Sequence, residues 1–428
     1  MYLDSRTTDV RMRGFPKLAT VTEALNMFFE QLRLERLQSE TVLTLQALGR
    51  VLAEDIVCQK DVPPFNRSAV DGYALRAQDA FGCSQTNPIV LQVAGNSSIG
   101  TMPSVSVEKQ QAVRIATGAP IPLGADAVVM LEFTEVTQTN KIEVYRPVTS
   151  GENVSLQGED VKKGDLILRP GTVIKSQDVG ILAALSVTEI QVTRRPKVAV
   201  LSTGDELVNL GREPTGGKIV DSNRPAILAM VVSAGGEPVD LGIAADEGDE
   251  IAGKLKRGIA ECDVVLATGG TSVGERDLLP SVVNSLGAPG VIVHGVAMRP
   301  GRPVALAAVD GKPVILLPGF PVAAMIAFDV FAQPIMNRLL GVAASLPSPA
   351  VKARALRRMA SSLGNRTFAR VVVKRSDGEY FFEPLRTSGS GIISSMVRAN
   401  GMVTISENKE GIEEGETVEV TLMRPVEG

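Results

Sequence analysis

Cysteine is scarce in this sequence, which has three cysteines among its 428 residues: Cys58, Cys83 and Cys262. They lie far apart without paired spacing, so the sequence predicts neither a disulfide framework nor a structural zinc cluster. Disulfides are rare in proteins of reducing compartments, so the scarcity of cysteine favours such a compartment. Residues 1–17 also lack the apolar core of a signal peptide. We therefore expect a cytoplasmic protein.

An excess of charge of either sign is also missing. The chain has 44 basic and 48 acidic residues and a formal net charge of −4. This balance gives no general attraction to nucleic acid or to an anionic membrane, so any bound anion must be held by a local site. The longest apolar tract, Pro313–Ala332, is interrupted by Pro318, Gly319, Pro321 and Asp329. The sequence therefore predicts no nucleic-acid partner and no membrane segment.

Histidine occurs once, at His294, within an apolar run typical of a strand. Ser-His-Asp and Cys-His mechanisms need a histidine base, and a histidine in such a run is more often a packed ring than a catalyst. Catalysis by His294 is the less favoured interpretation. The chain also lacks a Gly-x-x-x-x-Gly-Lys-Ser/Thr loop and a dinucleotide-binding glycine triplet after its first α/β strand. These absences exclude ordinary NTPases and dehydrogenases.

What the sequence contains is a succession of patterns that divides it into parts. A chain of 428 residues, 44% of them apolar, is too long for one core and predicts two to four domains. We expect a multidomain α/β protein with an N-terminal framework of helices and strands (1–58 and 148–195) and an inserted β-rich domain (59–147). A doubly wound α/β domain (196–346) and a C-terminal β-barrel-like domain (347–428) would follow.

Hydrophobic periodicity predicts the elements of these parts. In the framework, Thr22 would cap a helix, and further helices would span Gln46–Ala53 and Ser176–Leu185. The strands predicted for the insert are Ile89–Val93, Ala112–Ala116 and Ala127–Leu131, with a hairpin turn at Thr139-Asn140. The α/β domain would contain strands at Val198–Leu201, Val239–Ile243, Val264–Ala267, Val291–Val296 and Val314–Leu317, with helices at Pro225–Ala234 and Glu250–Glu261. The last strand would be Thr417–Leu422.

A glycine-rich loop follows one of these strands, in the segment Asp263–Asp277. Its glycines let backbone N–H groups approach an anion, and the helix that follows adds the positive end of its dipole. Ligands of such sheets bind beyond the carboxyl ends of the strands, where Ser202–Glu206 would also lie. The loop predicts a phosphate site. The alternative is an ordinary strand-to-helix turn, which needs glycine whether or not it binds a ligand.

Aspartates stand in several polar turns, at Asp71, Asp160 and Asp221. Carboxylates spread over loops are compatible with Mg²⁺, which takes one or two carboxylates together with substrate phosphates and water. The alternative is structural, because aspartate at a turn usually bonds its own backbone, and Asp221 could cap a helix. From the residues alone both roles stay open.

Two arginines, Arg299 and Arg302, flank Pro300 and Gly301 near the end of a strand. Guanidinium groups on a proline-stiffened backbone suit a tetrahedral oxyanion or a phosphate, and their charge does not depend on pH. A solvated surface pair is the alternative. Pro318–Ala323 supplies a further constrained turn at the edge where a ligand of an α/β sheet would lie.

In their order along the chain, these motifs resemble those of the molybdopterin molybdenumtransferase family, which includes the MoeA proteins and the E domain of gephyrin. The similarity covers about Pro16–Pro425. The motifs that carry it are Ser68–Ala74, Thr117–Met130, Gly151–Val154, Gly158–Asp160, Ser202–Leu207, Asp221–Asn223, Gly269–Asp277, Arg299–Pro303 and Leu317–Pro321. Each motif alone is weak, whereas all of them in sequence are highly specific.

The resemblance implies an enzyme that joins molybdate, or tungstate, to the dithiolene of adenylylated molybdopterin with Mg²⁺, and releases AMP and molybdenum cofactor. It also implies a homodimer that contacts the molybdopterin adenylyltransferase. By the matching motifs, the catalytic residues would be Asp71, Thr117, Asp160, Glu206 and Asp277, with Asp221 and Asp246 as metal ligands. Pterin, adenylate or oxyanion would be bound by Ser202, Thr203, Gly204, Ser222, Asn223, Gly269, Gly270, Thr271, Ser272, Gly274, Arg299, Arg302, Pro303, Arg366, Arg370 and Ser390. Asp71, Thr117 and Asp160 would close over the site from the other subunit.

The sequence departs from the family pattern at several of these positions. Arg299 and Arg302 stand where the family usually has lysines, and Phe320 and Ala323 where Asn and Ser are common. The arginines keep the charge but present bulkier planar forks to the oxyanion. A pterin-binding scaffold that does not catalyse insertion is a second hypothesis, because one fold can serve assembly as well as chemistry. The retained acids argue against it. Adenylyl transfer is a third hypothesis, but it would need only the α/β domain.

Overall fold

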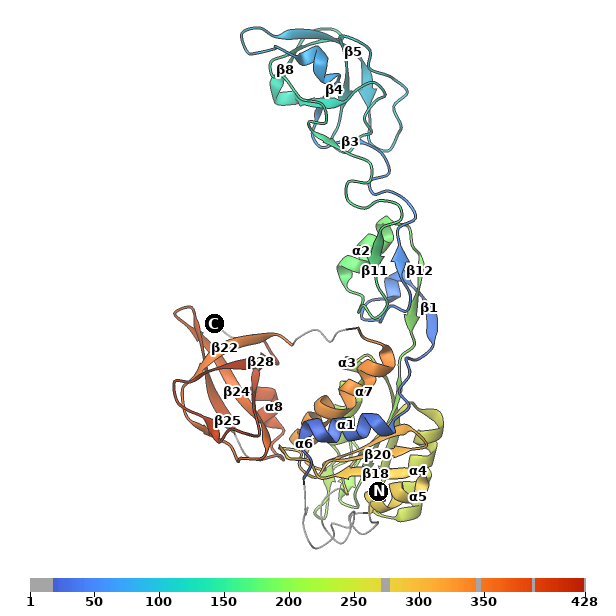
Figure 1. The fold of residues 1–428 in the computed structure, drawn as a ribbon, viewed down its shortest axis with the longest axis vertical. Coiled ribbons are helices and arrows are strands. Elements are labelled where there is room, and N and C mark those ends of the chain that lie inside the picture. Colours follow the sequence, from blue (N-terminus) through green and yellow to red (C-terminus); the bar gives the residue numbers. More distant parts are fainter. Residues whose placement is uncertain (1–17, 271–277, 344–347, 387–388, 427–428) are drawn as a thin grey trace.

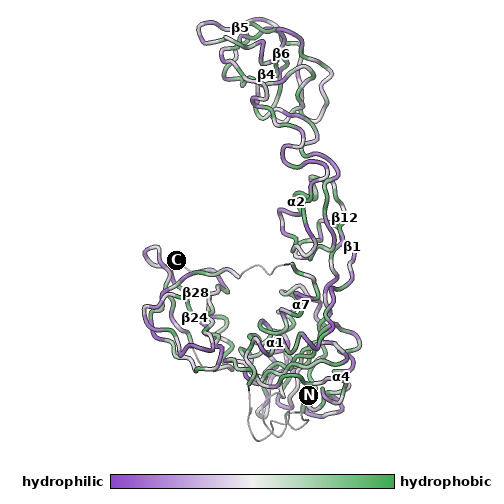
Figure 2. The backbone as a smooth tube through the Cα atoms, viewed as in Figure 1, coloured by the Kyte–Doolittle hydropathy of each residue, from purple (hydrophilic) through white to green (hydrophobic). Residues whose placement is uncertain are grey.

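The computed structural model describes residues 18–270, 278–343, 348–386 and 389–426. Figure 1 shows an elongated molecule: the inserted β-rich module forms one end, a small framework layer follows, and the α/β sheet lies at the other end beside a C-terminal β-barrel. The fold is a multidomain α/β fold, as the sequence predicts. Among the described residues, no helix is long and apolar enough to cross a membrane, and Figure 2 shows hydrophilic stretches interrupting the hydrophobic ones.

The α/β sheet has six strands in the order β16-β13-β17-β21-β20-β18. They are β13 (Lys197–Thr203), β16 (Glu237–Ala244), β17 (Val264–Thr268), β18 (Pro289–His294), β20 (Ala305–Val309) and β21 (Lys312–Leu317). The first four strands in this order are parallel, whereas β20 runs antiparallel to both of its neighbours. Five of these strands are predicted from the sequence. The alanine-rich β20 is not, because alanine has little strand preference.

Helices cover both faces of this sheet. They are α1 (Val21–Gln31), α3 (Asn223–Ser233), α4 (Gly248–Glu261), α5 (Leu279–Leu286), α6 (Pro321–Ala327) and α7 (Gln333–Leu340), with a π-helical turn, η4 (Phe328–Ala332), before α7. Val198 and Val200 belong to one hydrophobic core, whereas Ala199 and Leu201 belong to another. Alternate residues of a strand point to opposite faces, so these two cores lie on the two sides of the sheet.

The first helix differs from the expectation in two respects. The predicted cap at Thr22 is wrong, because the capping residue is Thr20. Thr20 Oγ1 accepts from the Glu23 N–H at 3.2 Å, and the Glu23 carboxylate accepts from the Thr20 N–H at 2.8 Å. This reciprocal pair needs a Glu or Gln three residues after the cap, and Glu23 stands three residues after Thr20 but not after Thr22. In addition, α1 packs in the α/β core through Phe28, whereas the sequence pattern grouped it with the framework.

The framework consists of two small antiparallel sheets and one helix. Its elements are β1 (Ser39–Leu43), η1 (Thr44–Gln46), β2 (Ile56–Val57), β11 (Leu166–Leu168), α2 (Ser176–Ala184) and β12 (Glu189–Thr193). The helix predicted for Ser176–Leu185 is confirmed, because it corresponds to α2. The helix predicted for Gln46–Ala53 is wrong: Gly49 has a φ of +74°, and Leu52 bridges Val192. A left-handed residue ends a helical turn, and the following residues are then free to pair as strand.

The inserted module has a six-stranded sheet of its own, in the order β7-β4-β6-β5-β9-β8. The elements of this region are β3 (Arg67–Ser68), β4 (Gly72–Leu75), η2 (Ala77–Ala80), β5 (Ile89–Ser97), β6 (Gln111–Ile115), β7 (Ala127–Met130), η3 (Leu131–Phe133), β8 (Thr134–Gln138), β9 (Lys141–Val144) and β10 (Val154–Ser155). Leu75, Leu91 and Ile142 lie in its core. The three predicted strands and the hairpin turn at Asn140 are confirmed.

The C-terminal region is a closed barrel. Its elements are β22 (Ala350–Ala355), β23 (Met359–Ala360), β24 (Arg366–Ser376), β25 (Glu379–Arg386), α8 (Ser394–Arg398), β26 (Gly401–Ile405), β27 (Gly411–Ile412) and β28 (Thr417–Leu422). Closure results from the pairing of β24 with β26, which completes the ring β24-β25-β22-β28-β26. A short strand that precedes β20, β19 (Met298–Arg299), pairs in parallel with β24. This pairing fixes the barrel against the α/β domain.

Candidate functional site

The carboxyl ends of β13 and β17 lie side by side, because Ser202 pairs with Thr268 in the parallel register. Ser202 Oγ and Thr268 Oγ1 are 2.9 Å apart, and Thr203 Oγ1 donates to the Thr268 carbonyl oxygen at 3.4 Å. Both Ser202 and Thr203 are buried. Their hydroxyl groups therefore join the two strand ends, and the ligand-binding role of these residues stays a prediction.

Backbone segments approach each other closely beyond these strand ends. Gly269 has a φ of +98°, and a Cβ atom there would lie 2.4 Å from the Thr203 carbonyl oxygen, so only glycine fits. A Cβ atom at Gly319 would lie 3.6 Å from Gly269 Cα. The loops that follow β17 and β21 therefore meet at this edge, where Gly270 also lies. The remaining predicted residues of the glycine loop lie outside the described residues: Thr271, Ser272, Gly274 and Asp277.

Asn223 connects the start of α3 to the loop after β21. Its Nδ2 donates to the Gly319 carbonyl oxygen at 2.6 Å. Its Oδ1 is buried without a hydrogen-bond partner among the described residues. The preceding Ser222 is exposed. A fixed amide whose oxygen has no partner can accept a hydrogen bond from an N–H group of a ligand.

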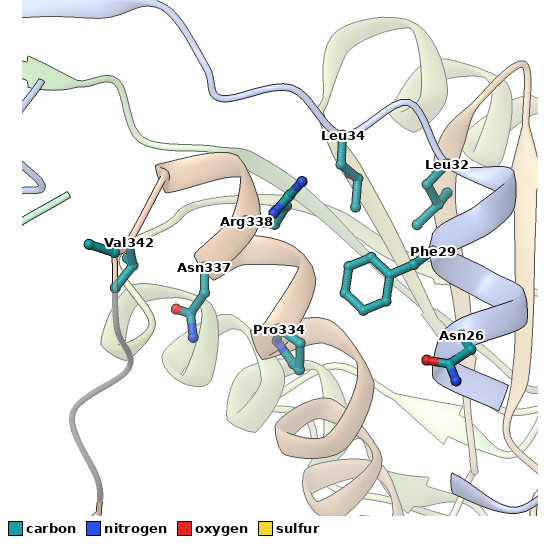
Figure 3. Close-up of a pocket in the computed structure, with 9 residues that line it drawn as sticks. Asn26, Phe29, Leu32, Leu34, Pro334, Asn337, Arg338 and Val342 are labelled. Atoms are coloured by element: carbon teal, nitrogen blue, oxygen red, sulfur yellow. The ribbon is translucent and has the colours of Figure 1, made fainter. Parts of the chain in front are cut away.

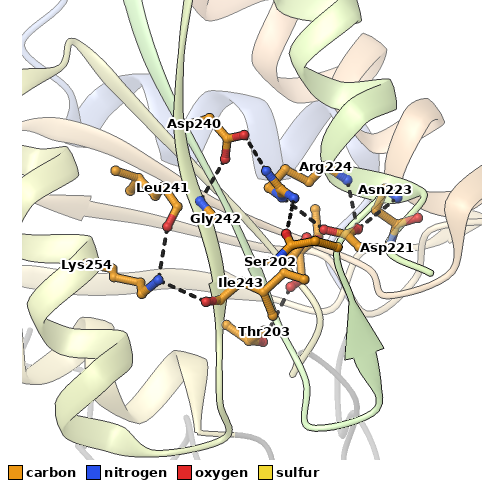
Figure 4. A network of polar contacts seen from close by, with 12 residues as sticks. Ser202, Thr203, Asp221, Asn223, Arg224, Asp240, Leu241, Gly242, Ile243 and Lys254 are labelled. Carbon is orange, nitrogen blue, oxygen red and sulfur yellow. Dashed lines mark hydrogen bonds and ion pairs between the residues drawn. The ribbon is translucent and has the colours of Figure 1, made fainter. Parts of the chain in front are cut away.

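Asp221, which the family motif assigns to a metal, is 2% exposed and contacts the start of α3 (Figure 4). Its Oδ1 accepts from the N–H groups of Asn223 and Arg224, each at 3.1 Å, and its Oδ2 pairs with Arg224 Nε at 3.0 Å. Arg224 also pairs with Asp240 and donates to Asn209. These are the contacts of a helix cap and a buried ion pair, so the geometry favours the structural alternative. The metal-binding role stays a prediction.

Further carboxylates lie on the loops that follow β13 and β16. Asp205 Oδ1 accepts from the Asp246 N–H at 3.1 Å. Glu206 is exposed, and its carboxylate lies against Gly204, where a Cβ atom would be 2.5 Å from Glu206 Oε2. In the part of the chain that the structure describes, no group of three His, Cys, Asp or Glu side chains could hold a metal ion. Because Mg²⁺ can be held by one or two carboxylates together with substrate phosphates, this finding does not test the roles of Glu206 and Asp246, which stay predictions.

A pocket of about 510 Å³ lies where the α/β domain meets the barrel. Its lining residues come from four segments: Met298, Arg299, Pro300, Gly301, Arg302 and Pro303; Pro318, Phe320 and Ala323; Arg370; and Gly389 and Ser390. Three of these described residues are arginines and none is acidic. Guanidinium groups create a positive local potential where no described lining residue carries a carboxylate. We call this the arginine pocket, and its charge suits an anion.

The barrel contacts both arginines of the Arg299-Pro-Gly-Arg302 turn. Arg299 Nη1 donates to Ser362 Oγ at 3.3 Å, and Arg302 Nη2 donates to Asn365 Oδ1 at 3.1 Å. Both arginines remain exposed to solvent. The structure therefore brings together Arg299, Arg302 and Pro303, all predicted ligand-binding residues, and fixes the two guanidinium groups from the neighbouring domain.

The family motif left two arginines of β24 as candidates, and their surroundings differ. Arg370 is 1% exposed and lines the arginine pocket. Arg366 does not line it, and its Nε pairs with Glu407 Oε1 of the barrel at 3.0 Å. The geometry supports Arg370 as the anion-binding residue and favours a structural ion pair for Arg366.

The start of α6 and the barrel segment around Ser390 form a further wall of the pocket. The Ser390 carbonyl oxygen accepts from the Val322 N–H at 3.0 Å. Phe320 is 63% exposed, and a Cβ atom at Gly391 would lie 3.3 Å from its ring. The predicted residue Ser390 is thus part of the pocket, and an exposed aromatic ring stands beside it.

The Pro318–Phe320 loop joins the arginine pocket to the edge of the sheet. Gly319 contacts Asn223 and approaches Gly269, whereas its neighbours Pro318 and Phe320 line the arginine pocket. The two regions are therefore adjacent. An extended ligand can contact both at once.

Asp71 and Thr117 contact each other in the inserted module. Asp71 Oδ1 accepts from the Thr117 N–H at 2.7 Å and from Thr117 Oγ1 at 3.0 Å, and these two bonds lower the pKa of Asp71. Asp160 lies between β10 and β11, where its N–H donates to the Val62 carbonyl oxygen. The module, with β4, and the α/β sheet lie at opposite ends of the molecule (Figure 1). Within one chain, these three residues do not join the arginine pocket.

Ser362 and Asn365 are contacts of the site that the sequence patterns do not reveal. They belong to a polar turn of the barrel without a chemical motif. The parallel pairing of Met298 with Arg366 places this turn beside the arginines. No sequence signal indicates that pairing, because β19 has only two residues.

A second pocket, of about 710 Å³, lies between α1 and α7. Figure 3 shows Phe29, Leu32 and Leu34 on one side of it, and Pro334 and Asn337 on the other. It shares no lining residue with the arginine pocket and contains none of the residues predicted from the sequence. Asn26, Asn337 and Arg338 make part of its lining polar, and no motif of the sequence predicts a ligand there.

Three family models match consecutive parts of the chain. Residues 19–186 match the MoeA N-terminal region (domain I and II). Residues 199–338 match the model described as a probable molybdopterin binding domain, and residues 352–423 match the MoeA C-terminal region (domain IV). The three matches follow one another in the order of the observed modules.

Individual relatives match nearly the whole chain. A molybdopterin biosynthesis protein of Methanocaldococcus jannaschii is 38% identical, over 96% of this chain and 100% of that protein. The molybdopterin molybdenumtransferase of Bacillus subtilis is 34% identical, over 91% of each chain. The crystal structure of the molybdopterin biosynthesis MoeA protein of Pyrococcus horikoshii superposes with a TM-score of 0.82 at 35% identity, and covers 95% of this chain and 100% of that one.

Proposed function

The chain belongs to the MoeA family, and we propose that it is a molybdopterin molybdenumtransferase that joins molybdate to adenylylated molybdopterin and releases AMP. Tungstate, a tetrahedral dianion like molybdate, is an alternative substrate. The single observation that carries the proposal is the arginine pocket next to the carboxyl edge of the α/β sheet. It combines a site for a tetrahedral anion with an edge where phosphate ligands of such sheets bind.

The arginines would hold the oxyanion. Arg299 and Arg302 come from one turn, and Arg370 comes from the barrel, so their guanidinium groups can approach a tetrahedral anion from different directions. Guanidinium forks donate two parallel hydrogen bonds to oxyanions, and the burial of Arg370 strengthens its interaction with a charge. Holding the oxyanion beside the dithiolene supplies most of what the reaction needs from the protein, because proximity converts an encounter into a step within one complex.

The edge of the sheet would hold the adenylylated pterin. Asn223 Oδ1 can accept from an N–H group of a heteroaromatic ring, and the glycines at 269 and 319 let a ligand approach the backbone. Phe320 offers an exposed ring beside the arginine pocket. These groups would orient the substrate so that its dithiolene faces the oxyanion while AMP leaves.

Magnesium remains part of the expected reaction mixture. Asp221 and Asp246 stay the predicted ligands, but Asp221 is engaged by Arg224 in the described structure. No step of the proposed mechanism is assigned to the metal. The arginines and amide groups carry the argument.

The direct test is to supply the purified protein with adenylylated molybdopterin, Mg²⁺ and either molybdate or tungstate, and to measure AMP release. Release that depends on an oxyanion would support the transferase. Absence of release with both oxyanions, from a protein that still binds the pterin, would favour the scaffold hypothesis.

We also propose that the site is completed in a homodimer, with Asp71, Thr117 and Asp160 supplied by the second subunit. The separation of the inserted module from the arginine pocket within one chain supports this arrangement (Figure 1). A heterodimer of Asp71→Ala and Arg370→Met subunits would then keep one intact site and regain about half of the wild-type activity. An inactive heterodimer would contradict the shared site. The molybdopterin adenylyltransferase is the expected donor of the pterin.

A further inference from the structure

We propose that Ser362 and Asn365, in the barrel turn 361–365, are positioning residues that aim Arg299 and Arg302 at a tetrahedral oxyanion. The inference rests on the proposed function, because it concerns how the same pocket recognises its anion. It adds two residues that lie outside the motifs quoted from the sequence. It also makes the barrel responsible for the geometry of arginines that belong to the α/β domain.

The contacts between the two turns are regular. Arg299 donates to Ser362 and Arg302 to Asn365, so the partners are 63 residues apart in both pairs. The same offset follows from two segments lying side by side over several residues. The Arg366 N–H donates to the Ala297 carbonyl oxygen at 2.9 Å, directly beyond the turn. The arginine turn and the barrel turn are therefore joined at three places.

The barrel turn is itself well fixed. Asn365 is 9% exposed, and its Nδ2 donates to the Leu363 carbonyl oxygen at 3.3 Å. This contact orients the amide so that Oδ1 faces Arg302. The Gly364 N–H donates to the Glu407 carbonyl oxygen at 2.7 Å, and the Ser361 N–H donates to the Glu410 carbonyl oxygen at 2.7 Å. A held acceptor can fix the arginine that donates to it.

Both acceptors are neutral, which distinguishes this pair of arginines from others in the chain. Arg224 and Arg366 are balanced by carboxylates of Asp221, Asp240 and Glu407. A carboxylate partner would cancel the charge that an oxyanion needs. The hydroxyl of Ser362 and the amide oxygen of Asn365 orient the guanidinium groups and leave their charge to the ligand.

The physical gain is pre-organisation. Exposed arginine side chains have many rotamers, and fixing such a side chain on binding costs conformational entropy. One hydrogen bond from each guanidinium to the barrel removes part of that freedom in advance and leaves the other N–H donors for the anion. The effect depends on the planar forks of Arg299 and Arg302, which have several N–H donors each.

The experiment measures tungstate binding to the full-length protein by calorimetry, in Ser362→Ala, Asn365→Ala and the double variant. The matched control is Ser361→Ala, which removes a hydroxyl from the same turn that contacts Thr367 at 2.7 Å and no arginine. Ser362→Thr keeps a hydroxyl and should restore binding. Ser362 is exposed, so its variants should fold even if Asn365→Ala does not.

We expect each single alanine variant to weaken tungstate binding roughly three- to tenfold, with Ser361→Ala unchanged. In the AMP-release assay, KM for molybdate should rise by the same factor while kcat at saturating molybdate stays constant. Equal affinity in the wild type, Ser362→Ala and Asn365→Ala, or equal weakening in Ser361→Ala, would overturn the inference. So would a wild type that binds no tungstate. Binding is measured without turnover, so a failure of AMP release would reject the proposed function separately.

Discussion

The arginine pocket and the network around Arg224 are both built on arginine, but the protein balances their charges in opposite ways. Arg224 is buried between the carboxylates of Asp221 and Asp240 (Figure 4). In the arginine pocket, Arg299 and Arg302 donate to the neutral acceptors Ser362 and Asn365, and none of the lining residues that the structure describes is acidic. The charge of Arg224 is balanced by carboxylates of the chain, whereas the charges of Arg299 and Arg302 are available to an anion.

The difference indicates how a ligand site can be recognised in this fold. A buried charge is costly unless it is paired, so a charge balanced within the chain serves the structure. Arginines whose hydrogen-bond partners are neutral keep a positive electrostatic potential that can attract an anionic ligand. The number of arginines therefore says less than the kind of acceptor beside each one.

The sharpest way to break this comparison uses the two arginines of β24. Arg370→Met should lower kcat/KM for molybdate roughly 100-fold, because it removes a buried guanidinium from the anion site. Arg366→Met, in the same strand, should have little effect on molybdate use, because Arg366 pairs with Glu407. Oxyanion-dependent AMP release measures both. Equal losses in the two variants would show that a place in the lining of the arginine pocket does not separate their roles.

The second prediction concerns the ion pairs of Arg224 with Asp221 and Asp240. Asp221→Asn should lower the free energy of unfolding by about 2 kcal/mol, because it removes the carboxylate charge from a buried ion pair while Asp240 still contacts Arg224. Urea denaturation measures the change. A variant with unchanged stability but an altered Mg²⁺ requirement would instead favour the metal-binding role of Asp221.

The smallest effect concerns Asp263, which pairs with Arg194 at the amino-terminal edge of the sheet. Burial alone would raise the pKa of Asp263, but hydrogen bonds from Arg194 and the Lys197 N–H lower it below its usual value. A carboxyl group with a lowered folded pKa stabilises the fold above its unfolded pKa, and this contribution is lost as pH falls through the folded pKa.

Asp263→Asn should therefore cost about 1 kcal/mol at neutral pH, and its difference from the wild type should shrink below about pH 4. Thermal unfolding across this pH range measures it. A difference that grows toward acid pH would contradict the assigned sign.

Much of the fold could be predicted from the sequence because its elements carry strong local patterns. The aliphatic runs of β13, β17 and β21 and the alternation in the insert specify their strands without tertiary information. The predictions failed where a single glycine or the pairing with neighbouring strands overrode the local sequence pattern. Gly49 ends the helical pattern in the framework, and the alanines of β20 form a strand because neighbouring strands cover them.

The candidate site was predictable as a set of residues but not as a geometry. The motifs indicate Arg299, Arg302 and the two arginines of β24, but the choice of Arg370 over Arg366 depends on Glu407, which lies 41 residues further along the chain. Ser362 and Asn365 come into contact with the arginines only through the parallel pairing of β19 with β24. Contacts between domains produce no periodic pattern of residues that a sequence could reveal.

The most direct test of the central claim is the molybdate dependence of AMP release in the wild type and in the Arg299→Ala, Arg302→Ala double variant. If these arginines hold the oxyanion, the variant should need at least about tenfold more molybdate for half-maximal release, since each lost charged hydrogen bond weakens binding. An unaltered molybdate dependence would contradict the arginine pocket as the oxyanion site.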